Sequence, residues 1–66
     1  MPLIQVNMLE GRTAAQKKAM LNAITNAVHE SIGAPINSIR VWIHEFPDTD
    51  FMAGGVLARE REATSS

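Results

Sequence analysis

Three residues in this chain carry groups that could act together in proton-transfer chemistry, namely Pro2, Arg12 and Arg40. Removal of Met1 would leave Pro2 with a free secondary amine, which is a base and a nucleophile without a flexible side chain. An α-amino group titrates at about 7.7–8.0 in model peptides, and burial or nearby cations lower that pKa because both disfavour the charged form. A base whose pKa lies near the working pH is well suited to general acid–base catalysis.

The two arginines supply what such a base lacks. Each guanidinium can bind a carboxylate through a bidentate pair of hydrogen bonds. Beside a neutral amine, the two cations would also lower the pKa of the amine and stabilise negative charge on an enolate. A structural interpretation stays open for each residue: Pro2 begins a strand, Arg12 lies on the surface at a helix start, and Arg40 belongs to a strand-end ion pair.

Residues 3–9 and residues 39–46 alternate in the way that predicts β-strands. Glu10-Gly11-Arg12 ends the first strand, with Gly11 as the turn residue. One face of the two strands is uniformly apolar and carries Ile4, Val6, Met8, Ile39, Val41 and Ile43.

A helix is predicted between the two strands. Thr13 followed three residues later by Gln16 is a capping box, which marks the helix start. Apolar residues recur at helical spacing as far as about Ile32, and Gly33 is a typical residue for the end of a helix. Lys17 is among the polar residues that we assign to the solvent side.

A strand, a helix and a strand form a βαβ unit, in which the strands should be parallel with a right-handed crossover. The single helix can cover one face of the sheet. The opposite face carries Leu3, Leu9, Trp42 and Phe46, and a monomer should not expose such a patch. The sequence therefore predicts an α+β fold that oligomerises by sheet-on-sheet contact.

The remaining residues add little to this unit. Residues 51–57 resemble a short hairpin with Gly54-Gly55 at its bend, and residues 59–66 are expected to form a frayed tail. Repeats are absent from the sequence, so residues 1–66 are interpreted as a single domain.

The strand direction decides which of the chemical groups can meet. Pro2 and Arg40 both lie near strand starts, so parallel pairing makes them neighbours. Arg12 follows the far end of the first strand, and seven residues at about 3.3 Å each put it roughly 23 Å from Pro2. Arg12 must therefore come from another subunit if it serves the same site. Leu9 and Phe51 could exclude water there.

Composition narrows the class of protein. The chain has 66 residues, a net charge of −1 and no cysteine, which excludes disulfides and thiolate metal sites. His29 and His44 lack metal-ligand spacing, so no metal is expected. The small net charge and the absence of basic runs argue against nucleic acid and anionic membranes as partners. No apolar stretch approaches the roughly 20 residues of a transmembrane helix, and we expect a cytoplasmic protein stabilised by oligomerisation.

Taken together, several short motifs resemble the tautomerase superfamily, and in particular the 4-oxalocrotonate tautomerase (2-hydroxymuconate tautomerase) family. Any one motif is weak evidence, but the ordered set is specific and extends over about residues 2–58. The motifs are Pro2-Leu3-Ile4, Leu9-Glu10-Gly11-Arg12, Gln16-Lys17, Ala34-Pro35, Ser38-Ile39-Arg40-Val41, Glu45, Phe51 and Gly54-Gly55.

The resemblance implies a β-α-β subunit that dimerises, with three dimers forming a hexamer, and an isomerase without metal or organic cofactor. It implies that Met1 is removed and that Pro2 is the general base. It also implies that Arg40 engages the substrate oxygens, that Arg12 binds the distal carboxylate, and that Leu9, Ser38 and Phe51 contact the substrate. The family reaction converts 2-hydroxymuconate to 2-oxo-3-hexenedioate through a dienolate, in aromatic hydrocarbon catabolism.

The sequence departs from the family pattern at a few positions, and two alternative functions stay open beside the isomerase. Ala53 stands where a larger aliphatic residue is usual, which implies a roomier pocket, and Trp42 and His44 are bulkier than usual. A hydratase or dehalogenase of 3-haloacrylates would need a carboxylate near Ala53 and an arginine in place of Leu9, and both are absent. The second alternative is a non-catalytic or heteromeric subunit with the same fold.

Overall fold

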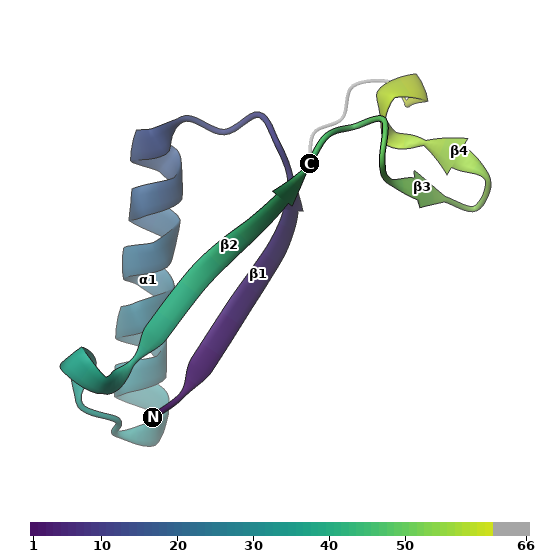
Figure 1. Cartoon of the computed structure of the whole chain (residues 1–66). Coiled ribbons are helices and arrows are strands. Elements are labelled where there is room, and N and C mark those ends of the chain that lie inside the picture. The colour runs from purple at the N-terminus through teal and green to yellow at the C-terminus, as the bar shows by residue number, and fades with distance from the viewer. Residues whose placement is uncertain (62–66) are drawn as a thin grey trace.

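The protein is described by a computed structural model, in which residues 1–61 can be placed (Figure 1). The elements follow in the order β1, α1, β2, β3 and β4, with short 3-10 helices before β2 and after β4. This arrangement confirms the predicted α+β fold. The bounds are β1 Leu3–Leu9, α1 Ala14–Ile32, η1 Ile36–Ser38, β2 Arg40–Phe46, β3 Met52–Ala53, β4 Val56–Leu57 and η2 Ala58–Glu60.

β1 and β2 pair in parallel, as the βαβ pattern predicts. The register runs from Leu3 opposite Arg40 to Leu9 opposite Phe46. Figure 1 shows α1 lying along one face of these two strands, and the N-terminus lies at the end where β2 begins. The sheet therefore has one face covered by the helix and one face open.

The ends of α1 are those that the sequence predicts. The Thr13 hydroxyl accepts a hydrogen bond from the Gln16 N–H at 3.1 Å, and the Thr13 N–H donates to Gln16 Oε1 at 2.9 Å. Gly33 adopts a left-handed conformation with φ of 75°, and its N–H donates to the His29 carbonyl at 2.9 Å. Because both signals are local, they fix the ends of the helix without help from packing.

Two expectations for the sheet need correction. β2 begins at Arg40 rather than Ile39, because the Ile39 N–H closes the preceding 3-10 turn on the Ile36 carbonyl at 3.2 Å. On the open face, Leu3 and Trp42 are 64% and 43% exposed, as predicted. Leu9 and Phe46 are half-buried instead, since the ring of Phe46 packs against the edge of Phe51 at 6.0 Å between centroids.

The core of the subunit is small. Among residues 1–61, Ile39 at 8% exposure is the one apolar side chain that is buried. The helix-facing residues of both strands are half-buried. A chain of this size buries little apolar surface by itself, so the exposed Leu3 and Trp42 favour association with further copies.

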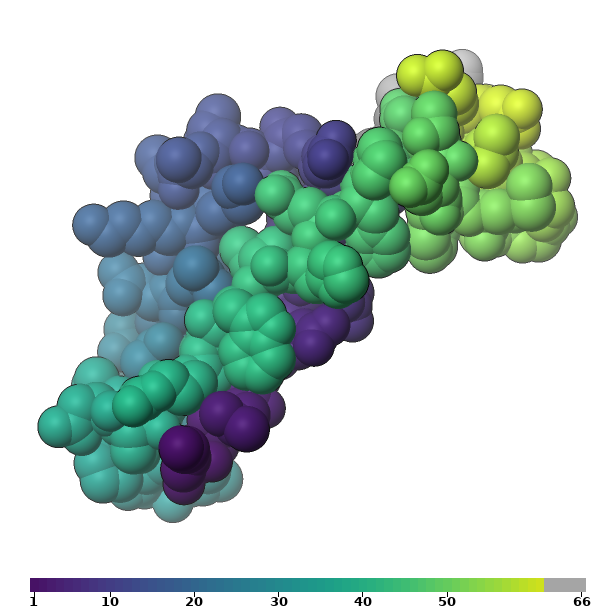
Figure 2. Space-filling view, viewed as in Figure 1, coloured from purple at the N-terminus to yellow at the C-terminus, as the bar shows by residue number. Residues whose placement is uncertain are grey.

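The hairpin of β3 and β4 projects beyond the end of β2, away from α1 (Figures 1 and 2). Gly54 and Gly55, with φ of 61° and 86°, form its bend, as a two-residue hairpin turn requires. Arg59 and Glu60 do not belong to the expected frayed tail, because Ala58–Glu60 form a turn of 3-10 helix and the Arg59 N–H donates to the Asp48 carbonyl at 3.1 Å. Residues 62–66 lie outside the described residues.

The subunit is elongated, with extents of 42 × 23 × 15 Å. An isolated two-stranded hairpin is at best marginally stable in water. Met52 and Val56 of this hairpin are also exposed. The hairpin therefore presents apolar surface that is not covered within residues 1–61.

Candidate active site

The backbone of Pro2 is joined directly to β2. The Arg40 N–H donates to the Pro2 carbonyl at 3.1 Å. The next residue, Leu3, lies opposite Arg40 as the first pair of the β1–β2 register. Pro2 itself is half-buried. The prediction that Pro2 and Arg40 are neighbours at the strand starts is confirmed within a single chain.

The side chain of Arg40 is held close to the same end of the sheet. Its Nη1 donates to the Asn37 carbonyl at 2.8 Å, so the guanidinium lies over the 3-10 turn before β2. Ser38 belongs to that turn, and its hydroxyl donates to the Pro35 carbonyl at 2.8 Å. A guanidinium has five N–H donors, so the contact with Asn37 leaves donors for a substrate oxygen.

Arg12 lies at the opposite end of β1. The Glu10 N–H donates to the Phe46 carbonyl at 2.9 Å, which extends the strand pairing by one residue. Gly11 then turns the chain with φ of 130°. Arg12 follows and lines a pocket of about 230 Å³ together with Met8, Gln16, Lys17 and Met20.

Leu9 and Phe51 share this far end. Leu9 is paired with Phe46 in the strand register, and Phe46 contacts the ring of Phe51 edge-on. Phe51 is 41% exposed and lies directly before the hairpin. The exposed part of this ring can cover a ligand that is bound at a neighbouring subunit.

The six predicted site residues therefore fall into two groups. We call Pro2, Ser38 and Arg40 the proximal half-site, and Leu9, Arg12 and Phe51 the distal half-site. β1 has seven residues, and at about 3.3 Å per residue it separates the groups by roughly 20 Å. A single chain does not bring them together, so a site that contains both must be assembled from two or more copies.

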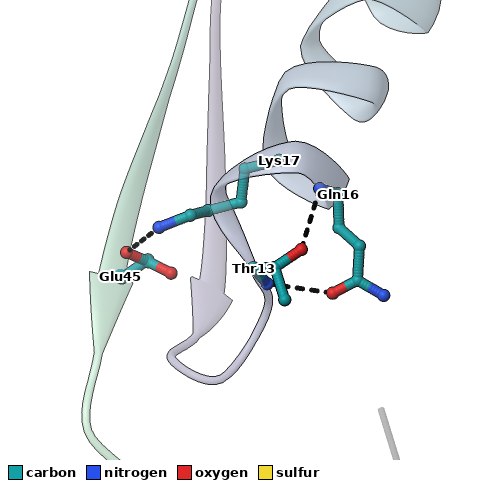
Figure 3. A network of polar contacts seen from close by, with 4 residues as sticks. All are labelled: Thr13, Gln16, Lys17 and Glu45. Carbon is teal, nitrogen blue, oxygen red and sulfur yellow. Dashed lines mark hydrogen bonds and ion pairs between the residues drawn. The ribbon is translucent and has the colours of Figure 1, made fainter.

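The sequence does not predict one interaction that lies beside the distal half-site. Lys17 Nζ and Glu45 Oε1 form an ion pair at 3.1 Å, and their side chains are 29% and 25% exposed (Figure 3). Lys17 was assigned to the solvent side, and that assignment is wrong. The order of the elements could have indicated this ion pair. A βαβ unit places the start of the helix beside the ends of the strands, where Glu45 lies.

Neither metal nor membrane features stand out in residues 1–61. No group of three or more histidine, aspartate or glutamate side chains in this range is arranged to hold a metal ion. None of the helices placed there has the length and apolar character needed to cross a membrane.

The fold is that of a small α+β protein with Pro2 and Arg40 at one end of its parallel sheet and Arg12 after the other end. A family model described as tautomerase enzyme matches residues 2–61. The chain belongs to this tautomerase family, as the motifs of its sequence indicated.

Relatives of known name agree with this assignment. A 2-hydroxymuconate tautomerase of Comamonas testosteroni is 47% identical over 60 residues, which cover 91% of this chain and 95% of the relative. A 4-oxalocrotonate tautomerase isozyme structure from Methylibium petroleiphilum superposes with a TM-score of 0.84 at 43% identity, over 88% of this chain and 94% of that one. A heterohexamer 4-oxalocrotonate tautomerase from Chloroflexus aurantiacus superposes with a TM-score of 0.87 at 33% identity. The superposition covers 91% of this chain and 97% of that one.

Proposed function

We propose that this protein tautomerises a 2-hydroxydienoate such as 2-hydroxymuconate to 2-oxo-3-hexenedioate, with Pro2 as the general base after removal of Met1. The observation that carries the proposal is the hydrogen bond from the Arg40 N–H to the Pro2 carbonyl at 3.1 Å. It sets Pro2, the residue directly before β1, beside Arg40, which bears a cation. The 47% identity to a 2-hydroxymuconate tautomerase supports the choice of substrate.

The proposed reaction moves one proton. The Pro2 amine accepts the proton of the 2-hydroxyl group, and the resulting dienolate spreads its negative charge along the conjugated chain. The protonated Pro2 amine then delivers a proton to carbon 5, which leaves a 2-keto group and a double bond between carbons 3 and 4. Base and acid are the same nitrogen, so no water has to enter the site.

The other half-site residues stabilise the charge that this proton transfer creates. Arg40 would bind the oxygens at the 2-hydroxy end, with Ser38 beside it in the turn. Arg12 of another subunit would bind the distal carboxylate and draw electron density towards it. Leu9 and Phe51 would supply the apolar wall that excludes water and strengthens these charge interactions.

A second copy is required by this scheme. The exposed Leu3 and Trp42 on the open sheet face provide a surface for it. We propose a homohexamer built as a trimer of dimers, located in the cytoplasm and active in the catabolism of aromatic hydrocarbons. The mass of the native protein in solution would test the first of these points.

The decisive experiment is the ultraviolet rate of 2-hydroxymuconate ketonisation, measured on protein whose intact mass shows that it begins at Pro2. We expect kcat/KM within the usual enzymatic range of about 10⁴–10⁸ M⁻¹s⁻¹. A rate equal to the uncatalysed background would refute the proposal for this substrate.

A heteromeric or non-catalytic subunit is the second candidate. The observation in its favour is that the Chloroflexus aurantiacus relative, 33% identical, is a heterohexamer. A protein of this kind would show no turnover alone and would gain activity when a second tautomerase chain is added. Hydration or dehalogenation of 3-haloacrylates is less well supported, since Ala53 and Leu9 replace the acid and the arginine that it needs. Chloride release from 3-chloroacrylate would reveal that activity.

A further inference from the structure

We propose that Lys17 and Glu45 are positioning residues for Arg12, and that their ion pair sets how tightly the protein binds a dicarboxylate. This inference rests on the proposed function, in which Arg12 binds the distal carboxylate. Figure 3 shows the two side chains pointing toward one another between α1 and β2, beside the hydrogen bonds of the capping box.

The backbone around Arg12 has no regular structure of its own. Arg12 lies between the end of β1 and the start of α1, and it follows Gly11, whose φ of 130° is open to glycine and strained for other residues. The contacts that hold the chain on either side therefore contribute to its position. A carboxylate clamp needs such support, because a small misplacement of a binding group can cost a large factor in rate.

Before Arg12, the anchor is a backbone hydrogen bond. The Glu10 N–H donates to the carbonyl of Phe46, the last residue of β2. This bond fixes the chain two residues ahead of Arg12. It reaches the strand position directly after Glu45.

After Arg12, the anchor is the first turn of α1. The Lys17 N–H donates to the Thr13 carbonyl at 3.0 Å, and the capping box joins Thr13 to Gln16. Thr13 is bonded directly to Arg12, so a movement of this turn carries Arg12 with it. The Lys17 side chain then joins the turn to Glu45 at 3.1 Å.

Both anchors thus connect the chain around Arg12 to the end of β2, one through Phe46 and the other through Glu45. The Lys17–Glu45 pair is about three-quarters buried at each side chain, so solvent and salt screen it less than an exposed pair. Another ion pair joins Arg59 to Asp48 at 3.5 Å, and its side chains are 58% and 51% exposed. It links η2 to the loop after β2 and provides a control.

The test compares a dicarboxylate with a monocarboxylate of the same type. The variants are Glu45→Gln and Lys17→Met, which remove one charge each and keep the size of the side chain. For 2-hydroxymuconate we expect KM to rise about 3- to 30-fold, the usual range for a residue that acts through its neighbours, with kcat nearly unchanged. For 2-hydroxy-2,4-pentadienoate, which lacks the distal carboxylate, we expect KM to stay at the wild-type value.

Two further variants separate positioning from simple destabilisation. The charge-exchanged double variant Lys17→Glu/Glu45→Lys should recover much of the lost dicarboxylate affinity, because the pair is restored in reverse. Asp48→Asn breaks the exposed pair and should leave both KM values unchanged. Native mass and circular dichroism should be the same for all four proteins.

The outcomes are distinguishable from failure of the proposed function. If wild-type protein does not turn over 2-hydroxymuconate, the proposed function fails, and calorimetric binding of cis,cis-muconate, an unreactive dicarboxylate, then tests the positioning alone. Weaker muconate binding by Glu45→Gln than by Asp48→Asn would support it. The positioning role of Lys17 and Glu45 would be overturned by equal changes in KM for both substrates, by a fall in kcat alone, or by unchanged muconate binding.

Discussion

The two ends of the β1–β2 sheet are built by different kinds of contact. At the strand starts, the links to Pro2, Ser38 and Arg40 are hydrogen bonds to backbone atoms of the strand and of the turn before it. At the strand ends, one backbone hydrogen bond from the Glu10 N–H to the Phe46 carbonyl is joined by a side-chain ion pair, an aromatic edge contact and a glycine turn. The same two strands thus carry a proximal half-site held through backbone atoms and a distal half-site that also depends on contacts between side chains.

This difference matches the work that each half-site would do. A general base must be placed accurately against one proton, and backbone pairing provides that accuracy independently of nearby side chains. A carboxylate clamp sets affinity and substrate choice, and side-chain contacts can change without loss of the fold. We therefore expect changes at the proximal end to reduce kcat and changes at the distal end to alter KM.

The largest effect is expected at the proximal half-site. Protein that retains Met1 has an amide nitrogen at Pro2, and Pro2→Ala alters the geometry of the amine. Each should lower kcat by about 10²- to 10⁴-fold, the usual contribution of general acid–base catalysis, while the oligomer stays intact. Mass spectrometry identifies the N-terminus, and the ketonisation assay gives the rate. Near-normal turnover by either protein would refute the assignment of Pro2 as base.

Arg12→Ala should act mainly on KM for a dicarboxylate. Hydrogen bonds to charged groups contribute about 1.5–3 kcal/mol, which corresponds to a rise in KM of about 10- to 100-fold. A monocarboxylate has no distal charge to lose and should be affected far less. Lys18→Ala, which removes an exposed cation of α1, is the control for a general effect of charge. An equal rise for both substrates would mean that Arg12 is not the distal clamp.

Mixed oligomers test directly whether the two half-sites come from different chains. Pro2→Ala and Arg12→Ala subunits would be unfolded together and refolded together. Some sites would then combine an intact proximal half-site with an intact distal half-site, and activity should exceed the sum of the two separate variants. Activity no greater than that sum would place both half-sites of each working site in one chain, against the separation along β1.

The open sheet face should determine assembly. Trp42 is 43% exposed in the single chain, and a large aromatic side chain at an interface commonly contributes about 2 kcal/mol or more. Trp42→Ala should therefore weaken association by about 30-fold, measured by sedimentation at decreasing protein concentration. Ile32→Ala removes an exposed apolar side chain at the end of α1 instead, and an equal loss of association would argue against the sheet face as the main contact.

The sequence predicted those features that depend on local signals. The capping box at Thr13 and Gln16 and the left-handed Gly33 mark the helix ends by themselves, and the alternation of residues 3–9 defines the first strand. Strand direction followed from the βαβ order, and with it the neighbourhood of Pro2 and Arg40. These predictions needed no knowledge of how the elements pack.

The features that were missed depend on packing between elements. Lys17 looks solvent-facing from the helical pattern alone, and its partner Glu45 is distant in the sequence. Phe46 was expected to be exposed on the open face, but it is half-buried because it packs against Phe51, whose position depends on the loop after β2. Most of these misses lie at the distal end of the sheet, where contacts between side chains help to hold the site.

The smallest effects should come from the two ends of α1, which lie at opposite ends of the sheet (Figure 1). Thr13→Ala removes the cap beside Arg12 and should lower the free energy of unfolding by about 1 kcal/mol. Gly33→Ala places a side chain at φ of 75° and should cost about 1–2 kcal/mol. Thermal unfolding at matched protein concentration measures both changes.

Although the losses of stability are similar, Thr13→Ala alone should also raise KM for the dicarboxylate, because the first turn of α1 holds Arg12. Thr13→Ser keeps the capping oxygen and should restore both properties. If Gly33→Ala raised that KM equally, loss of stability rather than the position of Arg12 would explain the effect, and the functional distinction between the two ends would fail.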